Sequence, residues 1–173
     1  MKRHLFAIMV VAMFSIIGSK AQAQSYIVVD SEKIFKAIAS YNTAVSELDN
    51  KSKAYQQEID DEFDKLEKQY NTYQSQKANY SASQRSAAER SIISKEEEIT
   101  KRQEEIFGED GIIEKLREEK LKPIQDKVFK VIDAYAAANG YDLVIDIASN
   151  PIVLYYAPKA DKTQEIIKIV NNN

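Results

Sequence analysis

Apolar residues recur at helical spacing along two long segments of this chain, and this pattern constrains the fold more than any other feature. On the second segment, Ile92, Ile99, Ile106 and Ile113 follow one another at intervals of seven residues. A seven-residue apolar repeat makes a narrow seam on a helix, and a second helix must cover such a seam. On the first segment, the predicted seam consists of Ile34, Ile38, Tyr41, Val45, Leu48, Tyr55, Ile59, Phe63, Leu66, Tyr70 and Tyr73.

A single polar interruption at residues 79–83 separates the two segments. Two seams joined by a short turn predict an antiparallel coiled-coil hairpin of two helices. At a rise of 1.5 Å per residue, arms of roughly 40 residues would reach about 60 Å. The second seam continues towards the C-terminus through Leu116, Leu121, Ile124, Val128, Val131 and Tyr135.

Three residues interrupt the helical pattern of the second segment. Gly108 and Gly111 are three apart, and each glycine inside a helix costs about 1 kcal/mol relative to alanine. A kink, a bulge or fraying is therefore expected there. Pro123 should kink the helix or restart it near Lys122. We interpret these positions as hinges; the alternative is that they only bend the arm to follow its partner helix.

Short strand-like and helical segments lie at both ends of this pattern. Asp30 or Ser31 can cap the first helix, and Gly140 is suited to end the second. Strands are predicted at residues 25–30, 141–147 and 152–156, with a turn at 148–151 and an amphipathic helix at 162–170.

The predicted fold class is α+β, mostly α, with a long helical hairpin on a small β body. The body would contain residues 25–48 and 121–173, and the arm residues 49–120. Three short strands and one helix bury too little to be stable alone, and the chain has no cysteine for a disulfide. We therefore expect an oligomer in which strands of neighbouring chains close each other's edges.

The N-terminus has the features of a secretory signal peptide. A basic start at residues 1–4 precedes an apolar run at residues 5–18, and Ala21 and Ala23 supply small residues before a cleavage site. Cleavage would leave residues 24–173 as a single exported domain. The alternative is an uncleaved membrane anchor, but the apolar run is short for a bilayer span.

Removal of residues 1–23 would also change the net charge of the chain and the side chains available for catalysis or metal binding. The segment holds three of the 24 basic residues and none of the 27 acidic ones, so 21 basic and 27 acidic residues remain, a net charge of −6. It also holds His4, the only histidine. Without histidine or cysteine, the usual nucleophile–base pairs and zinc sites are excluded.

The carboxylates of this chain fit a solvated helix surface better than a reaction centre. Acidic runs such as residues 60–64 and 96–98 alternate with lysines at helical spacing, as surface ion pairs do. We expect no enzymatic activity, no cofactor, no metal site and no small-molecule substrate. Nucleic acid is not expected as a partner either, because the chain is acidic.

The turn of the hairpin, at residues 71–94, differs in charge from the rest. It carries three basic residues and one acidic residue, Glu89, a local charge of +2. One interpretation is a solvated turn. The other is a mobile contact surface of aromatic and cationic groups, with the candidates Tyr70, Tyr73, Lys77, Tyr80, Arg85 and Arg90. Tyr70 and Tyr73 also fit the helix seam, which is the alternative for these two.

Taken together, these segments resemble the Skp/OmpH family of periplasmic chaperones over the whole chain after the signal peptide. The terminal blocks, in this order around a hairpin, carry the resemblance, whereas the coiled-coil middle is unspecific. These blocks are IVVDSEKIF at 27–35, LKPIQDKV at 121–128, NGYDLVID at 139–146, VLY at 153–155 and DKTQEII at 161–167.

The resemblance implies a trimer shaped like a jellyfish, in which strands of three chains form the body and three helical tentacles enclose a cavity. It also implies a periplasmic location and the ATP-independent holding of unfolded outer-membrane proteins, with transient membrane association at most. Between chains, we expect packing by Val28, Leu143, Ile145, Val153 and Tyr155.

One departure from the family concerns charge. Family members are often basic, whereas this chain without residues 1–23 is negative. Electrostatic capture of clients should therefore be weaker, and no lipopolysaccharide site is carried over. The alternative to a chaperone is a structural adaptor whose arms dock on one folded partner in the cell envelope.

Overall fold

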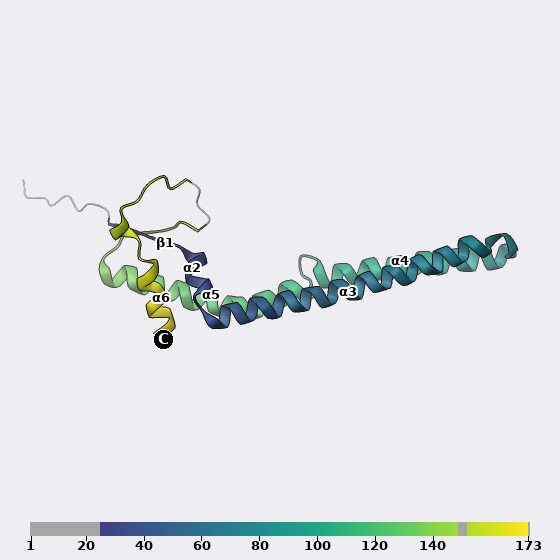
Figure 1. Ribbon diagram of the computed structural model, residues 1–173, viewed down its shortest axis with the longest axis horizontal. Helices are drawn as coiled ribbons and strands as arrows, with labels where there is room; N and C mark the ends of the chain where they lie inside the picture. The colour runs from purple at the N-terminus through teal and green to yellow at the C-terminus, as the bar shows by residue number, and fades with distance from the viewer. Residues whose placement is uncertain (1–24, 149–151, 173) are drawn as a thin grey trace, which may run out of the picture.

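The computed structural model describes residues 25–148 and 152–172, which form a small body and one long arm (Figure 1). The predicted signal peptide at residues 1–23 lies outside the described residues, as does most of the turn predicted at 148–151. In chain order, the elements are β1 (Tyr26–Val29), α2 (Ser31–Lys36), α3 (Ala39–Gln76), η1 (Lys77–Asn79), α4 (Ala82–Phe107), α5 (Ile112–Asn139), β2 (Leu143–Asp146), η2 (Pro158–Ala160) and α6 (Thr163–Asn172).

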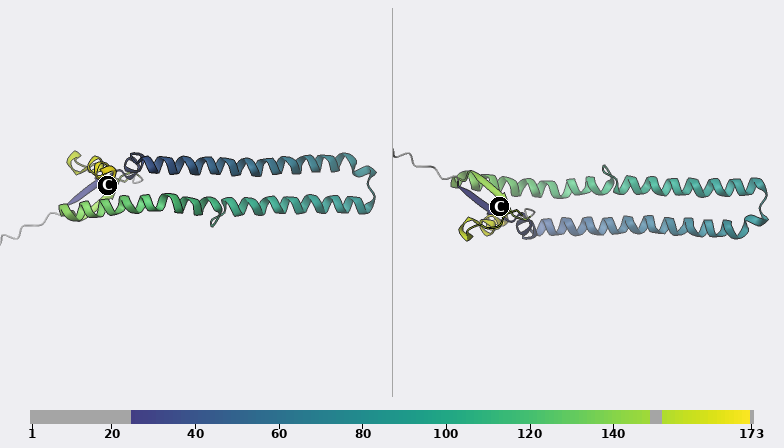
Figure 2. Two further views of the ribbon diagram at one scale, coloured as in Figure 1. Left: turned by 90° about the horizontal axis from the view of Figure 1, so that it is seen from below. Right: turned by 90° about the horizontal axis from the view of Figure 1, so that it is seen from above.

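The arm is a pair of antiparallel helical rods (Figure 2). α3 runs outward from the body, and α4 and then α5 return beside it. With 38 residues, α3 is about 57 Å long at 1.5 Å per residue. The structure therefore confirms the predicted antiparallel hairpin.

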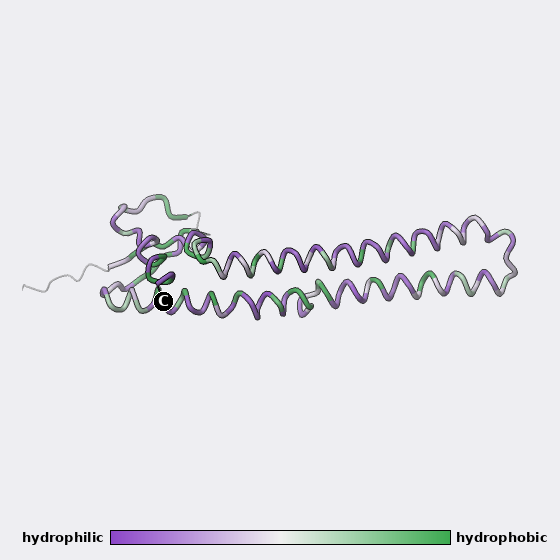
Figure 3. The backbone as a smooth tube through the Cα atoms, turned by 60° about the horizontal axis from the view of Figure 1, so that its bottom comes forward, coloured by the Kyte–Doolittle hydropathy of each residue, from purple (hydrophilic) through white to green (hydrophobic). Residues whose placement is uncertain are grey.

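Buried apolar residues at intervals of seven hold the two rods together. Ile59 and Leu66 of α3 form one buried cluster with Ile99 and Ile106 of α4. Tyr73 continues the α3 seam at the same interval and is also buried. Figure 3 shows such short apolar stretches recurring along two otherwise hydrophilic helices.

Three residues predicted for the seam lie at its margin instead. Val45, Phe63 and Tyr70 are each about two-fifths or more exposed. Ala44 takes the buried position beside Leu48, where Val45 was expected. A seam between two helices accepts a narrow stripe of each helix surface, so additional apolar residues are displaced to the edge.

The first helix of the pattern is interrupted within the body. Asp30 caps α2, because its carboxylate accepts a hydrogen bond from the Lys33 N–H, as the sequence predicted. The helix does not continue into the arm, since the backbone of Ile38 is extended and α3 begins after it. Ile34 and Ile38 therefore belong to the body core and not to the arm seam.

The sheet of the body has two parallel strands. β1 pairs with β2 in a register that sets Val28 opposite Ile145. On its other edge, the carbonyl of Val28 accepts a hydrogen bond of 2.9 Å from the N–H of Lys162, next to a bridge with Asp161. β1 thus has neighbours on both edges, whereas β2 pairs only with β1 among the described residues.

The third predicted strand, at residues 152–156, is wrong for the single chain. Residues 153–157 have no regular secondary structure, and they lie in the wide loop that leaves the body (Figure 1). A strand forms only against the backbone of another strand; both edges of β1 are occupied, and residues 153–157 do not pair with the outer edge of β2. Leu154 and Tyr155 are 95% and 83% exposed.

The core of the body joins elements from both ends of the chain. Ile27, Ile34, Val128 and Ile166, from β1, α2, α5 and α6, are completely buried in one cluster. The predicted C-terminal helix is confirmed as α6. Its first N–H, on Thr163, donates to the Asp161 carboxylate at 2.9 Å.

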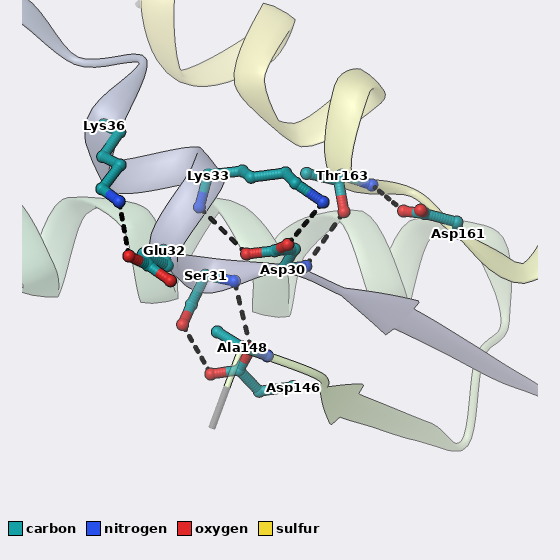
Figure 4. A network of polar contacts seen from close by, with 9 residues as sticks. All are labelled: Asp30, Ser31, Glu32, Lys33, Lys36, Asp146, Ala148, Asp161 and Thr163. Atoms are coloured by element: carbon teal, nitrogen blue, oxygen red, sulfur yellow. Dashed lines mark hydrogen bonds and ion pairs between the residues drawn. The ribbon is translucent and has the colours of Figure 1, made fainter. Parts of the chain in front are cut away.

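A polar network ties the start of α2 to both C-terminal elements (Figure 4). The hydroxyl of buried Thr163 accepts a hydrogen bond from the Asp30 N–H at 2.9 Å. At the end of β2, the Asp146 carboxylate accepts hydrogen bonds from the N–H and the hydroxyl of Ser31. Burial raises the pKa of Asp146, but the hydrogen bonds from Ser31 and Ala148 outweigh it, so the pKa lies below the ordinary 3.8.

α5 continues through Pro123 without interruption, so the predicted restart near Lys122 does not occur. Leu121 and Val128, on either side of the proline, are buried, and their packing holds the helix together across the missing hydrogen bond. Gly140 ends the helix with a φ of 67°, in the left-handed region that glycine adopts without strain.

The buried Thr163 hydroxyl gives a test of the polar network. We expect Thr163→Val to lower the free energy of unfolding by about 1–3 kcal/mol, because it leaves the Asp30 N–H without its partner. Urea unfolding followed by circular dichroism measures this. The control is Thr43→Val, whose exposed hydroxyl donates only to Ala39 of its own helix and should matter by less than about 0.5 kcal/mol. Equal effects of the two changes would contradict this role of Thr163.

Candidate functional site

The far end of the arm is a tight turn closed by a capping box. The Ser81 hydroxyl accepts a hydrogen bond from the Gln84 N–H, and the Gln84 side chain accepts one from the Ser81 N–H at 2.8 Å. Arg85 adds a hydrogen bond from Nε to the carbonyl of Tyr80. Sequence analysis missed this box, although Ser81 and Gln84 have the spacing that predicts one.

The candidate contact residues of the turn lie in different environments. Tyr73 is buried in the seam, and its hydroxyl donates to Glu89, whereas Tyr70 is 47% exposed. The Tyr80 ring is half-buried, with its centroid 6.3 Å from that of Tyr73. The exposed members are the cations Lys77, Arg85 and Arg90. The turn therefore presents cations and one tyrosine to solvent, while Tyr73 is part of the helix pairing.

Ion pairs cross between the two helices along the shaft of the arm. Within the described residues they are Glu47–Lys120, Glu58–Arg102 at 3.0 Å and Glu62–Lys95 at 2.8 Å. Arg102 also lies over the ring of Tyr55, 5.9 Å from its centroid. Each exposed pair contributes only about 0–1 kcal/mol, so their main effect is to fix the register of the two helices.

One edge of the seam carries most of these polar contacts. On a helix, residues three and four positions before a seam residue lie on opposite sides of it. Glu62 and Gln69 each stand four positions before a buried seam residue. Glu62 bonds across to Lys95, and Gln69 donates to the Ser91 hydroxyl at 3.1 Å. We call this side of the arm, with Glu62, Gln69, Ser91 and Lys95, the polar edge.

The opposite edge is apolar. Phe63 and Tyr70 stand three positions before the seam residues Leu66 and Tyr73. Their side chains are 39% and 47% exposed, and Ile93 of α4 is 54% exposed. Sequence periodicity placed Phe63 and Tyr70 in the seam and did not single out Ile93. Their spacing relative to the buried residues is the signal that separates seam from edge.

A loop at residues 108–111 separates α4 from α5 and protrudes from the side of the arm (Figure 2). A Cβ atom on Gly108 would lie 2.5 Å from the Glu104 carbonyl oxygen, and one on Gly111 would lie 2.6 Å from that of Ile106. Only glycine fits at positions 108 and 111 without displacement of the backbone. The expected interruption of the helix is therefore present, as a loop between two helices, and its role as a hinge stays a prediction.

The residues predicted to pack between chains differ in their accessibility within one chain. Leu143 and Tyr155 are exposed, and Ile145 and Val153 are half-buried. Val28, by contrast, is completely buried within this chain. Near the body, a groove of about 780 Å³ runs along α5 beside α6, with Val131, Ala134, Tyr135, Ala138 and Ile169 in its wall.

The described residues lack two features that would indicate other kinds of site. None of their helices is both long enough and apolar enough to cross a membrane. They also contain no group of three or more carboxylate or imidazole side chains arranged to hold a metal ion.

Comparisons with known proteins agree with this architecture. The family model described as "Outer membrane protein (OmpH-like)" matches residues 25–170. A crystal structure of a candidate outer membrane chaperone (OmpH-like) from Caulobacter crescentus CB15 superposes with a TM-score of 0.67. Its sequence is 11% identical, and the match covers 87% of this chain and 85% of the other, so it shows a shared fold. A comparison with curated protein sequences gives no match.

We expect the carboxylate of Glu62 to make the stability of the arm dependent on pH. Hydrogen bonds from Lys65 and Lys95 lower the pKa of Glu62 from 4.5 to about 2. Because the pKa is lower in the folded state, the stabilisation is complete above about 4.5 and is lost as the pH falls towards 2. We therefore expect Glu62→Gln to reduce the loss of stability over this range, measured by urea unfolding at several pH values.

The control for this experiment is Asp64→Asn. Asp64 is exposed, two residues away on the same helix, and has no ion pair among the described residues. This variant should keep the pH dependence of the unmodified protein. If Glu62→Gln kept it as well, the assignment of the pH effect to Glu62 would be wrong.

Proposed function

This chain belongs to the OmpH-like family of outer membrane proteins, and on that basis we propose that it is a chaperone of the bacterial periplasm. In this proposal it is an ATP-independent holdase that binds unfolded outer-membrane proteins between helical arms and prevents their aggregation. The observation that carries the proposal is the family match over residues 25–170, which includes the whole arm and nearly all of the body.

The accessible apolar surface of the body supports a homotrimer. Leu143, Leu154 and Tyr155 expose most of their side chains, and the outer edge of β2 has no strand beside it among the described residues. Removal of apolar surface from water contributes about 25 cal/mol per Å², and a neighbouring chain could supply both this burial and the missing strand partner. The arms of three such chains would then surround one space.

Packing between chains would involve four of the five residues predicted for it. Leu143 and Ile145 lie on β2, and Val153 and Tyr155 lie in the loop that follows. Val28 is already buried inside its own chain and contributes there. In the trimer, residues 152–156 would become the strand that the sequence predicts, because a neighbouring chain would provide a partner backbone.

Client binding in this proposal is the sum of many weak contacts. The aromatic and cationic groups that the turn presents to solvent, among them half-buried Tyr80 and exposed Arg85, each contribute about 0.5–1 kcal/mol. Three arms that contact one chain add their contributions through a high effective concentration. The glycine loop at 108–111 is the proposed hinge that adjusts the space between arms, since α5 is continuous through Pro123.

The positive charge of the turn would allow acidic clients to bind although the protein as a whole is negatively charged. The chain without residues 1–23 has a net charge of −6, but the turn at residues 71–94 is locally positive. Acidic client segments would therefore meet cations at the ends of the arms. Export by the N-terminal segment would place the protein in the compartment through which such clients pass.

Light scattering on residues 24–173, with and without an outer-membrane protein diluted from urea, tests the proposal. We expect a mass of three chains that increases by one client and a loss of client turbidity. A monomer or dimer that leaves aggregation unchanged would contradict the proposal. The protein would then be better described as a structural adaptor that docks on one folded partner.

A second experiment tests the role of the turn. We expect the combined change of Tyr80→Ser with Lys77→Gln, Arg85→Gln and Arg90→Gln to weaken client binding about thirtyfold, because four contacts of about 0.5 kcal/mol each sum to about 2 kcal/mol. Tyr73 is left unchanged because it supports the helix pairing.

The matched control removes three exposed cations from the shaft of the arm. It combines Lys51→Gln, Lys68→Gln and Lys122→Gln, at positions that form no ion pair within the described residues. Its net charge changes as much as that of the turn variant, and its client affinity should change much less. An equal loss in both variants would show that overall charge matters and the turn does not.

A further inference from the structure

The side of the arm that carries Phe63 and Tyr70, opposite the polar edge, is a second accessible surface, distinct from the turn. Phe63 and Tyr70 are seven residues apart on α3, so they share one side of the helix. Both are excluded from the seam by their position three residues before buried Leu66 and Tyr73. Aromatic rings held partly at the surface of a helix cost free energy through contact with water, and about two-fifths of Phe63 and half of Tyr70 remain accessible in the described chain.

Residues of α4 complete this edge. Lys95 and Glu96 stand four and three positions before buried Ile99, so they lie on opposite sides of the α4 seam. Lys95 meets Glu62 on the polar edge. Glu96 therefore lies on the apolar side of the arm, and so does Ile93, one helical turn before it. We call the surface formed by Phe63, Tyr70, Ile93, Glu67 and Glu96 the aromatic edge.

The carboxylates of the aromatic edge lack the cationic partners that the polar edge supplies. Glu67 lies between Phe63 and Tyr70 along α3, and Glu96 lies on the same side of the arm on α4. Neither forms an ion pair or a side-chain hydrogen bond within residues 25–148 and 152–172, whereas Glu62 has Lys65 and Lys95. The aromatic edge thus combines exposed apolar side chains with unneutralised negative charge.

We propose that the aromatic edge binds polypeptide segments in which apolar residues are combined with lysine or arginine. Apolar side chains of such a segment pack on Phe63, Tyr70 and Ile93, and its cations pair with Glu67 and Glu96. This complementarity is opposite in sign to that of the cationic turn. The inference rests on the proposed chaperone function and adds to it a class of client segment that the turn repels.

A synthetic peptide of alternating leucine and lysine, carrying one tryptophan, tests the proposal against residues 24–173. The chain has no tryptophan, so the emission of the probe reports its binding without background. A companion probe carries glutamate in place of lysine. We expect the lysine probe to bind more tightly than the glutamate probe, by about threefold to tenfold for one or two exposed ion pairs.

Two variants of the aromatic edge separate its apolar and charged contributions. Phe63→Ser with Tyr70→Ser should weaken the binding of the lysine probe by about tenfold. Glu67→Gln with Glu96→Gln should abolish the preference for lysine over glutamate. Both side chains of the second variant are exposed and unpaired, so the fold is not at risk.

The control for charge is Asp64→Asn with Glu97→Gln. These carboxylates are exposed, one on each helix, each close in sequence to an edge carboxylate, and neither has an ion pair among the described residues. The control loses the same net charge and should keep the preference for lysine. If it loses the preference as the edge variant does, attraction by the whole acidic protein explains the binding and the proposal is wrong.

The remaining outcomes distinguish this inference from the proposed function. Retained suppression of client turbidity, together with no effect of either edge variant on the probes, would overturn the inference and leave the chaperone function intact. If the unmodified protein does not hold a client but the lysine probe still binds through the aromatic edge, the proposed chaperone function is wrong and the aromatic edge is still a binding surface. The double variant Phe63→Ser with Tyr70→Ser could also change the oligomeric mass without changing the affinity for the probe. The edge would then be a contact between copies of this chain, and the proposal would be wrong.

Discussion

The contact of Ile59 and Leu66 with Ile99 and Ile106 is the interaction on which the rest of the arm depends. It is narrow, because two helices share only a stripe of their surfaces. Most of each helix therefore remains in water along the whole arm. The residues four positions before each buried residue lie on one side of the stripe, and those three positions before it lie on the other. The first set contributes to the polar edge, and the second set contributes to the aromatic edge.

The body, in contrast to the arm, joins segments that are far apart in the chain. β1 lies between β2 and the chain at Asp161, and the hydrogen bond to Thr163 adds a further connection to the C-terminal helix. Both edges of β1 are occupied within one chain, and residues 152–157, of which Leu154 and Tyr155 are strongly exposed, do not pair with the outer edge of β2. The unsatisfied surface of the body is thus concentrated at β2 and this loop, on the side where other chains could add to it.

The sequence pattern was sufficient for the hairpin, because a seven-residue repeat over such a length has one structural interpretation. It could not assign Phe63 to the edge, since periodicity alone does not show how wide a stripe the partner helix covers. It also failed for residues 152–156, because β propensity describes a segment and not its partner. The restart expected at Pro123 does not occur for a similar reason: packing on both sides of the proline overrides a local preference. The candidate contact residues at the turn were located by composition, and helical spacing also fitted Tyr70 and Tyr73 to the seam. The structure decides between these alternatives, because Tyr73 is buried and Tyr70 is 47% exposed.

The parallel pairing of β1 with β2 has a consequence for the order of folding. A chain is synthesised from its N-terminus, so β1 is made well before its neighbours at residues 143–146 and 161–163. The hairpin can form earlier, since its two helices are close in sequence at the turn and pair progressively from there. Until the final segments arrive, β1 is an apolar strand without a partner. This protein must therefore pass through the same vulnerable condition as the unfolded chains it is proposed to protect.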